Sequence, residues 1–455
     1  MRFWHTAAAL TWLQAILKER FGHTFALLPQ PDGNHITLCI PGDTRCINLT
    51  LDGSTFTRTD SSLCCAEWNA ISEGWNTPLP GSLPAPGAHD LSVPLITATE
   101  SGWHIGYDIL GLTYWMLTRQ EEVGRTDLDN HGRFPATASH AYMYGYLERP
   151  IVDEWLYVLG QVIGRTWPGI RLAQHCFEVK VSHDVDSPSL YAFKPWKMVA
   201  RMMAGHALKR RDLRAFCTAA LVKQMTKGTL HPADPHNTFE WLMDVSEANN
   251  LTSAFYFICG RTSEMDADYE PEDTIIRALM RRIHERGHEI GLHPSYGTYQ
   301  NPALVAQEAE RLRAILAEEN IQQSVIGGRM HYLRWEQPTT LQAWNDAGLA
   351  YDSTLGYADR PGFRCGTCFE YPAFNPASLQ PLGLRIRPLV VMECTIIGGV
   401  YSEAISVKLA ENKILELKEK CRALGGWFTI LWHNSFFTDD PRLKQLYMQL
   451  VEIKS

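Results

Sequence analysis

Residues 176–186 read Cys176-Phe177-Glu178-Val179-Lys180-Val181-Ser182-His183-Asp184-Val185-Asp186. The apolar run predicts a β-strand that ends at two carboxylates. In an extended chain, residues i and i+2 point the same way, so Asp184 and Asp186 share one face. Adjacent carboxylates raise one another's pKa, and a divalent metal relieves this conflict because one can bind the ion while the other acts as a base. The alternative is a polar cluster that caps a turn or helix.

Short apolar strands alternate with helices after this motif. Further strands are predicted at 253–258, 288–292, 324–328, 390–394 and 427–432, with helices at 274–286, 304–320 and 339–347 between them. Such alternation predicts parallel βα units. Polar residues gather where these strands end, and in a (β/α) barrel the active site forms at the carboxyl ends of the strands.

Three histidines follow predicted strands: His293, His331 and His433. An imidazole at such a position suits zinc or a similar metal. Each histidine alone is more often a satisfied surface or core residue. Together with Asp184 and Asp186, all at strand ends of one alternating region, they indicate a metal-centred site.

Three further features each allow two interpretations. Asp352 could hold a catalytic histidine by a hydrogen bond, or cap a turn. Arg329 could pair with Asp184 and keep it ionised, or lie on the surface. The loop Cys365-Gly366-Thr367-Cys368 could bind metal or change redox state, but a single CxxC is incomplete for structural zinc, so a structural role is favoured.

The bulk properties indicate an ordinary soluble protein. The chain has 455 residues, 45% apolar and 20% charged, which suggests two or three domains. A net charge of −8 argues against a protein that coats nucleic acid. The 11 cysteines have no framework spacing, the start has no signal-peptide cleavage pattern, and no apolar run approaches the roughly 20 residues of a membrane span. A cytoplasmic protein without a nucleic-acid partner is expected.

The pattern divides the chain into two regions. Residues 1–170 predict a smaller α/β or α+β domain, and residues 171–455 predict the barrel, with an inserted basic helical segment at about 188–250. Within it, residues 191–230 hold nine Lys or Arg and one Asp, interleaved with Trp196 and methionines. The segment predicts contact with an anionic glycan, a lipid headgroup or a membrane surface. A solvated amphipathic helix pair is the alternative.

Residues 174–440 resemble the polysaccharide deacetylases of carbohydrate esterase family 4, the NodB-homology domain. Ser182-His183-Asp184-Val185-Asp186-Ser187-Pro188 looks like the family's first motif. Arg286-Gly287-His288-Glu289-Ile290-Gly291-Leu292-His293 is the most specific match, and Gly328-Arg329-Met330-His331-Tyr332 stands where the family has Arg-x-Pro-Tyr. Trp427–His433 looks like the last motif. Within the first region, Leu117–Glu122 and His131–Pro135 resemble an uncharacterised domain found ahead of such deacetylase-like domains in bacteria.

The resemblance implies one divalent metal ion, zinc by preference, in a distorted barrel. It also implies that Asp186 and His293 bind the ion. The family's second metal histidine falls on Gly297, and we infer that His331 supplies the missing imidazole.

The resemblance further implies the catalytic roles. Asp184 would take a proton from water while Arg329 orients it. The backbone N–H of Tyr332 would stabilise the oxyanion, and His433, oriented by Asp352, would protonate the leaving amine.

The expected function is removal of an acetyl group from an N-acetylated sugar in a glycan or glycan precursor. Two alternatives remain open: a non-catalytic glycan- or lipid-binding protein on a degenerate barrel, and a metal-dependent hydrolase of another C–N bond, such as that of a cyclic amide. A cytoplasmic enzyme would act on a soluble or lipid-linked saccharide. The basic segment fits a lipid-linked substrate at the inner membrane face.

Overall fold

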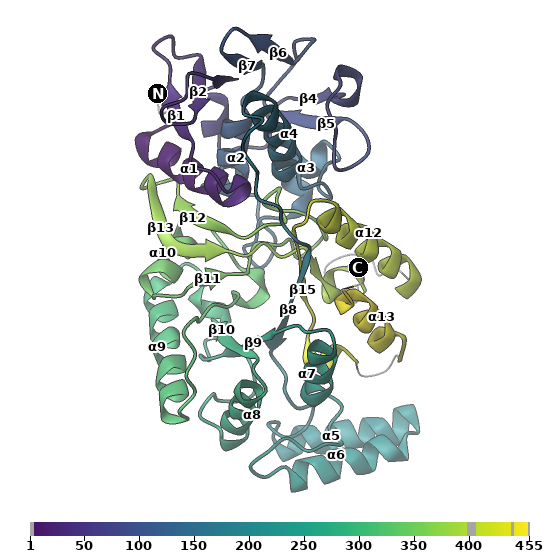
Figure 1. The fold of residues 1–455 in the computed structure, drawn as a ribbon. Helices are drawn as coiled ribbons and strands as arrows, with labels where there is room; N and C mark the ends of the chain where they lie inside the picture. The colour runs from purple at the N-terminus through teal and green to yellow at the C-terminus, as the bar shows by residue number, and fades with distance from the viewer. Residues whose placement is uncertain (1–3, 398–405, 438–440, 454–455) are drawn as a thin grey trace.

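The computed structural model describes residues 4–397, 406–437 and 441–453 (Figure 1). Its first region holds a mixed five-stranded sheet in the order β1-β2-β3-β7-β6. The strands of this sheet are β1 (Ala26–Pro29), β2 (His35–Cys39), β3 (Cys46–Thr50), β6 (Ile96–Thr99) and β7 (Gly102–Ile105). A separate antiparallel pair consists of β4 (Cys65–Trp68) and β5 (Leu83–Pro86). The helices are α1 (Ala7–Phe21), α2 (Ile109–Leu117), α3 (His140–Met143) and α4 (Ile151–Thr166). All of α2 is buried, as expected for a helix that is apolar on every side.

The second region contains a parallel five-stranded sheet in the order β10-β9-β8-β15-β14. Its strands are β8 (Glu178–Val185), β9 (Ser253–Ile258), β10 (Glu289–His293), β14 (Val391–Met392) and β15 (Trp427–Leu431). Single parallel bridges from Leu292 to Gly328 and from Gly328 to Asp352 continue the sheet to β11 (Tyr351–Asp352). Gly328 suits this contact because a Cβ there would lie 1.8 Å from the carbonyl oxygen of Leu292. Strand β11 in turn pairs in parallel with β13 (Gln380–Ile386).

The distorted (β/α) barrel expected from the sequence is not closed among the described strands, and the protein is a mixed α/β structure with an open sheet. One edge of β13 pairs with β11, and the other pairs with the antiparallel strand β12 (Tyr371–Asn375). No edge of β13 is therefore left for β14 among the described strands. Strands β12 and β13 lie instead beside α1 of the first region (Figure 1), where Trp12 donates from Nε1 to the carbonyl oxygen of Pro372 at 2.7 Å.

Helices cover the parallel sheet. They are α7 (Phe239–Ala248), α8 (Thr274–Glu285), α9 (Pro302–Glu318), α10 (Thr339–Asp346), α11 (Glu393–Ile396), α12 (Val407–Ala423) and α13 (Pro441–Val451). Helix α8 shows why they pack: Ile276, Leu279, Met280 and Ile283 are buried and follow the spacing of one helical face. Gly287, at a φ of 78°, lies just beyond its end, where a left-handed residue favours glycine. Short 3₁₀ turns lie at Thr55–Thr57, Ile71–Glu73, Gln120–Glu122, Ala136–Ala138, Tyr296–Thr298, His331–Leu333 and Asn434–Phe437.

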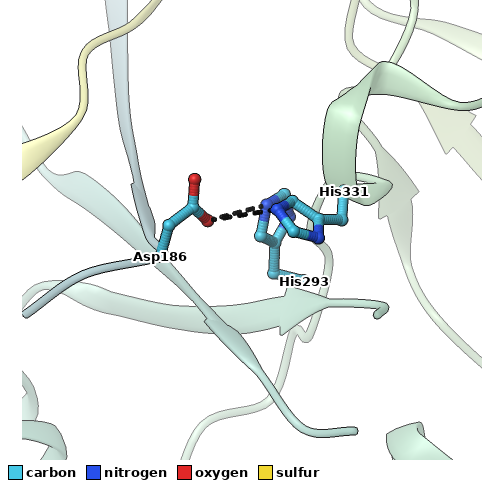
Figure 2. A group of neighbouring side chains, drawn as sticks. All are labelled: Asp186, His293 and His331. Atoms are coloured by element: carbon cyan, nitrogen blue, oxygen red, sulfur yellow. Dashed lines mark ion pairs between the residues drawn. The ribbon is translucent and has the colours of Figure 1, made fainter. Parts of the chain in front are cut away.

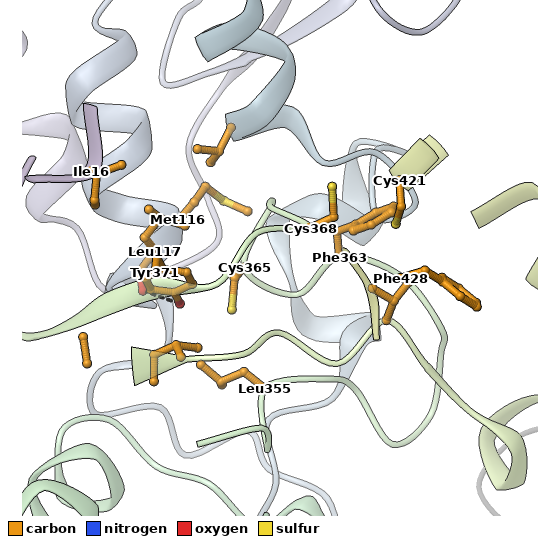
Figure 3. Close-up of a cluster of buried hydrophobic side chains, with 14 of the residues drawn as sticks. Ile16, Met116, Leu117, Leu355, Phe363, Cys365, Cys368, Tyr371, Cys421 and Phe428 are labelled. Carbon is orange, nitrogen blue, oxygen red and sulfur yellow. Dashed lines mark hydrogen bonds between the residues drawn. The ribbon is translucent and has the colours of Figure 1, made fainter. Parts of the chain in front are cut away.

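The two regions share one continuous hydrophobic core. Figure 3 shows Cys365 and Cys368 in the part of it that also contains Ile16, Met116 and Leu117 from the first region. Both thiols are buried, and burial raises the pKa of Cys365 to about 11, which fits the structural role favoured for this loop.

A buried ionic group joins the two regions beside this core. Glu122 accepts from Arg119 Nε at 2.9 Å and from Arg364 Nη2 at 2.6 Å. All three side chains are at most 3% exposed, so Glu122 of the first region and Arg364 of the second are paired away from water.

The basic segment forms a helical hairpin that extends from the body at the end opposite the first region (Figure 1). It consists of α5 (Trp196–Gly205), a π-helical turn (His206–Arg210) and α6 (Leu213–Met225). Helix α7 follows it and precedes β9. Among the described residues, no helix combines the length and apolarity needed to cross a membrane.

Candidate metal and catalytic site

Strand β8 carries Asp184 near its carboxyl end, and Asp186 follows directly after the strand. Asp184 Oδ1 accepts from Arg329 Nη1 at 2.8 Å. Arg329 is fully buried, and its other two nitrogens also donate: Nη2 to Ser182 Oγ at 2.8 Å and Nε to the carbonyl oxygen of Ser353 at 2.9 Å. The guanidinium is thereby fixed, and the Asp184 carboxylate has a permanent positive partner.

Asp186, His293 and His331 converge on one point (Figure 2). Asp186 Oδ1 lies 3.3 Å from His293 Nε2 and 3.8 Å from His331 Nε2. The other ring nitrogens face acceptors: His293 Nδ1 donates to the carbonyl oxygen of Arg329 at 2.6 Å, and His331 Nδ1 donates to Asp266 Oδ1 at 3.1 Å. Because a carbonyl or carboxylate oxygen only accepts, Nδ1 carries a proton in each ring, and Nε2 is the ring nitrogen that faces Asp186 and remains available to a cation.

These three side chains fit a divalent metal ion. One carboxylate oxygen and two imidazole nitrogens lie within 4.8 Å of one another, which is a donor set that zinc accepts. Asp186 Oδ1 is buried and has no hydrogen-bond partner among the described residues, so a cation would satisfy an otherwise orphaned acceptor. Burial alone would raise the pKa of Asp186, but the neighbouring His331, His293 and His433 hold it well below its usual range.

His433 stands on the opposite wall, 3.5 Å from Asp186 Oδ2 through its Nε2. Its Nδ1 contacts Glu393 Oε1, which also accepts from the backbone N–H of His433 at 3.1 Å. Burial would lower the pKa of His433, yet Glu393 and Cys394 raise it well above its usual value. Glu393, Cys394 and His433 are also close enough to hold an ion. Because Glu393 contacts His433 directly, we interpret this group as an oriented, protonated imidazole and not as a second metal site.

The expected contact between Asp352 and His433 is wrong. Asp352 accepts from Trp335 Nε1 at 3.1 Å and from the backbone N–H of Thr354 at 2.8 Å. It lies at the end of β11, and burial raises its pKa to about 6. The carboxylate beside His433 comes from Glu393, at the end of β14. Glu393 falls inside the predicted strand 390–394, so nothing in the strand pattern singled it out.

Tyr332 follows His331 in a left-handed backbone conformation, with a φ of 61°, and Leu333 has a φ of 56°. Such values are strained for residues with a Cβ and persist only where the surroundings hold them. The Tyr332 N–H donates to no acceptor among the described residues. Its carbonyl oxygen accepts from Arg133 Nη1 at 2.9 Å. The first region therefore helps to hold this loop.

Residues 131–133 of the first region pack against the loop beside the site, which the sequence did not predict. The carbonyl oxygen of His131 accepts from Arg334 Nε at 2.7 Å, and that of Gly132 accepts from Tyr299 Oη at 2.8 Å. The His131 ring also lies 4.8 Å from the Tyr332 ring. Local sequence holds no signal for these contacts because they join segments about 170 to 200 residues apart.

A cavity of about 210 Å³ contains the site. Its polar lining includes Asp184, Asp186, His293, His331, His433 and Arg133. Its apolar lining consists of Leu333, Met392, Leu431 and Phe436. A larger cavity of about 700 Å³ is lined in part by α11, but its carboxylates Glu148 and Glu416 are paired with lysines, and Asp359 accepts from the backbone N–H of Ala136. The smaller cavity is therefore the one with convergent, unsatisfied donor atoms.

Residues 12–168 match the model of a family of unknown function, DUF7033. This agrees with the expected resemblance of the first region to an uncharacterised domain and leaves the second region outside the match. A comparison with curated proteins finds no match.

Two solved structures show low similarity to the chain. The crystal structure of a "putative polysaccharide deacetylase from Mycobacterium smegmatis" has a TM-score of 0.39 and 15% identity, covering 62% of this chain and 86% of that one. Puue allantoinase has a TM-score of 0.37 and 13% identity, covering 63% and 85%. At such TM-scores neither likeness bears on the assignment of the site, which stands on its geometry.

Proposed function

We propose that this protein is a metal-dependent hydrolase that removes the acetyl group from an N-acetylated sugar. The observation that carries the proposal is the convergence of Asp186, His293 and His331 between a charge-paired Asp184 and a carboxylate-bound His433 in one cavity. The apolar wall of Leu333, Met392 and Leu431 supports a small acyl group as the part of the substrate that enters.

Asp186, His293 and His331 would hold the ion. When bound, a divalent ion such as Zn²⁺ supplies Lewis-acid polarisation of a carbonyl oxygen and lowers the pKa of a water molecule. Asp266 and the carbonyl oxygen of Arg329 fix the two imidazole rings for this task.

Asp184 is placed to act as the general base. Arg329 holds Oδ1, while Oδ2 lies 3.6 Å from His293 Nε2 and faces the cavity. It takes one proton from the attacking water as the water oxygen bonds to the acetyl carbon. The Tyr332 N–H is free to donate to the oxyanion that develops on the carbonyl oxygen.

His433 is placed to act as the general acid. Glu393 keeps the imidazole protonated and oriented, with Nε2 toward the cavity. As the C–N bond breaks, Nε2 gives its proton to the departing nitrogen. The products are acetate and the free amino sugar, and the electrons of the broken bond stay on nitrogen.

The test combines metal analysis with hydrolysis assays. We expect the purified protein to contain a stoichiometric divalent metal and to release acetate from a panel of N-acetyl sugars, but not to open cyclic amides. Asp184→Asn and Asp186→Asn should abolish hydrolysis while circular dichroism shows an intact fold. His331→Ala should bind less metal, and His89→Ala, which changes an exposed histidine of the first region, is its matched control.

Three outcomes would reject the proposal. A protein that binds glycans without hydrolysing any would be a binding protein on this scaffold. Ring opening of cyclic amides with no acetate release would place the site in a different hydrolase class. Full activity in Asp184→Asn or Asp186→Asn would rule out the mechanism.

A further inference from the structure

The hairpin α5–α6 has a small hydrophobic core of its own. Tyr191, Val199, Ala219 and Val222 are buried together, with Met202 and Met203 against them, and this cluster is separate from the main core. Tyr191 Oη also lies 3.1 Å from His206 Nε2, which ties the turn to the base of the hairpin. The two helices are therefore held together without using their outward-facing apolar residues.

Those outward-facing residues are large and exposed. They are Trp196, Met198, Leu208, Leu213, Leu221 and Met225. The most exposed are Leu208, at 80%, inside the π-helical turn, and Leu213, at 70%, at the start of α6. Single exposed apolar residues are ordinary, but two such leucines at the end of one protruding hairpin form a local apolar tip.

Cations surround this tip. Lys209, Arg210, Arg211 and Arg214 are exposed, and none forms an ion pair with any residue that the structure describes. The nearest carboxylate in the chain, Asp212, accepts from the backbone N–H of Ala215 at 2.9 Å and caps α6. The whole chain carries a net charge of −8, so this basic tip is a local exception.

We propose that the α5–α6 hairpin docks on an anionic lipid bilayer, with Leu208 and Leu213 entering the headgroup region and the four cations binding lipid phosphates. Apolar side chains ringed by Lys and Arg on a protruding element combine the two contributions that membrane-surface helices use. A nucleic acid would engage the cations but leave two exposed leucines without a partner. A symmetric contact between the tips of two copies of this chain would bring four cations against the same four.

The hairpin also continues from the strand end that bears the candidate site. Residues 187–195 connect Asp186 to α5, and Figure 1 shows the hairpin beyond the end of β8 toward which the strand arrow points. If the tip docks on a bilayer, the side of the molecule toward which β8 points would face the membrane.

The test is co-sedimentation of the full-length protein with vesicles of phosphatidylcholine, with or without phosphatidylglycerol. We expect binding to the phosphatidylglycerol vesicles at low ionic strength, little binding to pure phosphatidylcholine, and release at high salt. Leu208→Ser with Leu213→Ser should weaken partitioning at least roughly tenfold, because two leucine side chains no longer leave water. Arg210→Gln with Arg211→Gln should weaken it and reduce its salt dependence.

Two matched controls accompany these variants. Ile71→Ser with Met448→Ser changes exposed apolar residues outside the hairpin, and Arg171→Gln with Arg360→Gln changes exposed cations outside it. Both should bind vesicles like the unmodified protein, and all variants should melt at similar temperatures.

Four results would overturn the proposal. The first is a protein that stays in the supernatant with anionic vesicles at low salt. The second is unchanged binding by both hairpin variants. The third is a dimer in solution that the leucine substitutions dissociate. The fourth is binding to single-stranded DNA at least as tight as to vesicles. None of these results depends on hydrolytic activity, so this proposal and the proposed function fail separately.

Discussion

Arg133 Nη1 donates to the carbonyl oxygen of Tyr332 at 2.9 Å, and its Nε donates to Asp129 at 2.7 Å. One guanidinium thus links the first region to the strained turn beside the candidate site. The planar fork allows both bonds at once, whereas an ammonium group is a point charge that cannot reproduce them.

Arg133→Lys should therefore lower kcat roughly tenfold or more, since the Tyr332 turn loses a charge-assisted hydrogen bond of about 1.5–3 kcal/mol. Metal content should stay unchanged because no proposed ligand moves. Steady-state kinetics with metal analysis check this, and Arg125→Lys, whose arginine pairs with Asp127 in the same region, serves as control. An unchanged kcat would show that the turn keeps its shape without Arg133.

Asp266→Asn should weaken metal binding by roughly 10- to 100-fold, because the His331 ring loses the carboxylate that orients it and raises its basicity. Titration of the metal-free protein with zinc measures the effect. Asp268→Asn is a close control, since Asp268 lies two residues away in the same loop and pairs with Lys194 at the surface. Equal affinities for the two variants would remove Asp266 from the site.

Glu393→Gln should change the pH dependence of hydrolysis. Glu393 raises the pKa of His433, and a general acid works only while protonated, so activity falls as the pH rises through that pKa. Without the charge of Glu393 the pKa drops, and the alkaline limb of kcat/KM should move to lower pH. A limb that stays in place would mean that another group supplies the proton.

His140 should make the fold sensitive to acid. The ring is buried, with Nε2 near the carbonyl oxygen of Leu63, and burial lowers its pKa to about 4. Between pH 6.5 and about 4 the unfolded chain binds a proton that the folded protein does not. The free energy of unfolding therefore falls as the pH drops through this window, by up to roughly 3 kcal/mol.

Urea unfolding at pH 7, 5.5 and 4 measures this effect. In His140→Gln the decline with acidification should be smaller than in the unmodified protein, because glutamine takes up no proton. Parallel declines in the two proteins would show that His140 does not contribute to the acid sensitivity.

The strands that carry the site residues could be predicted from their apolar runs. The apolar runs before Asp184, His293 and His433 form strands, and parallel neighbours bring their ends to one edge of a sheet. The lack of closure could not be predicted from local patterns. It depends on β12, which runs antiparallel to β13 and occupies its edge. The residue pattern of a strand does not specify which neighbour it pairs with.

The residues that orient the site, Asp266, Arg133 and Glu393, could not be predicted for a related reason. Asp266 lies in an irregular loop without periodicity, and Arg133 lies in a region that pattern alone separates from the barrel. Glu393 lies inside the predicted strand 390–394, and the pattern gave no reason to prefer it to Asp352 as the partner of His433. Only the spatial order of the strands distinguishes them, since β14 neighbours β15, which leads to His433, while β11 does not.

The buried group of Arg119, Glu122 and Arg364 decides how the chain can be divided. A fragment that begins near residue 171 keeps Arg364 but loses Glu122, which pairs with it at 2.6 Å. The fragment also exposes the shared core. We therefore expect the two regions to unfold together in one cooperative transition, and a shortened gene that encodes only the proposed catalytic region to give an insoluble product rather than a smaller enzyme.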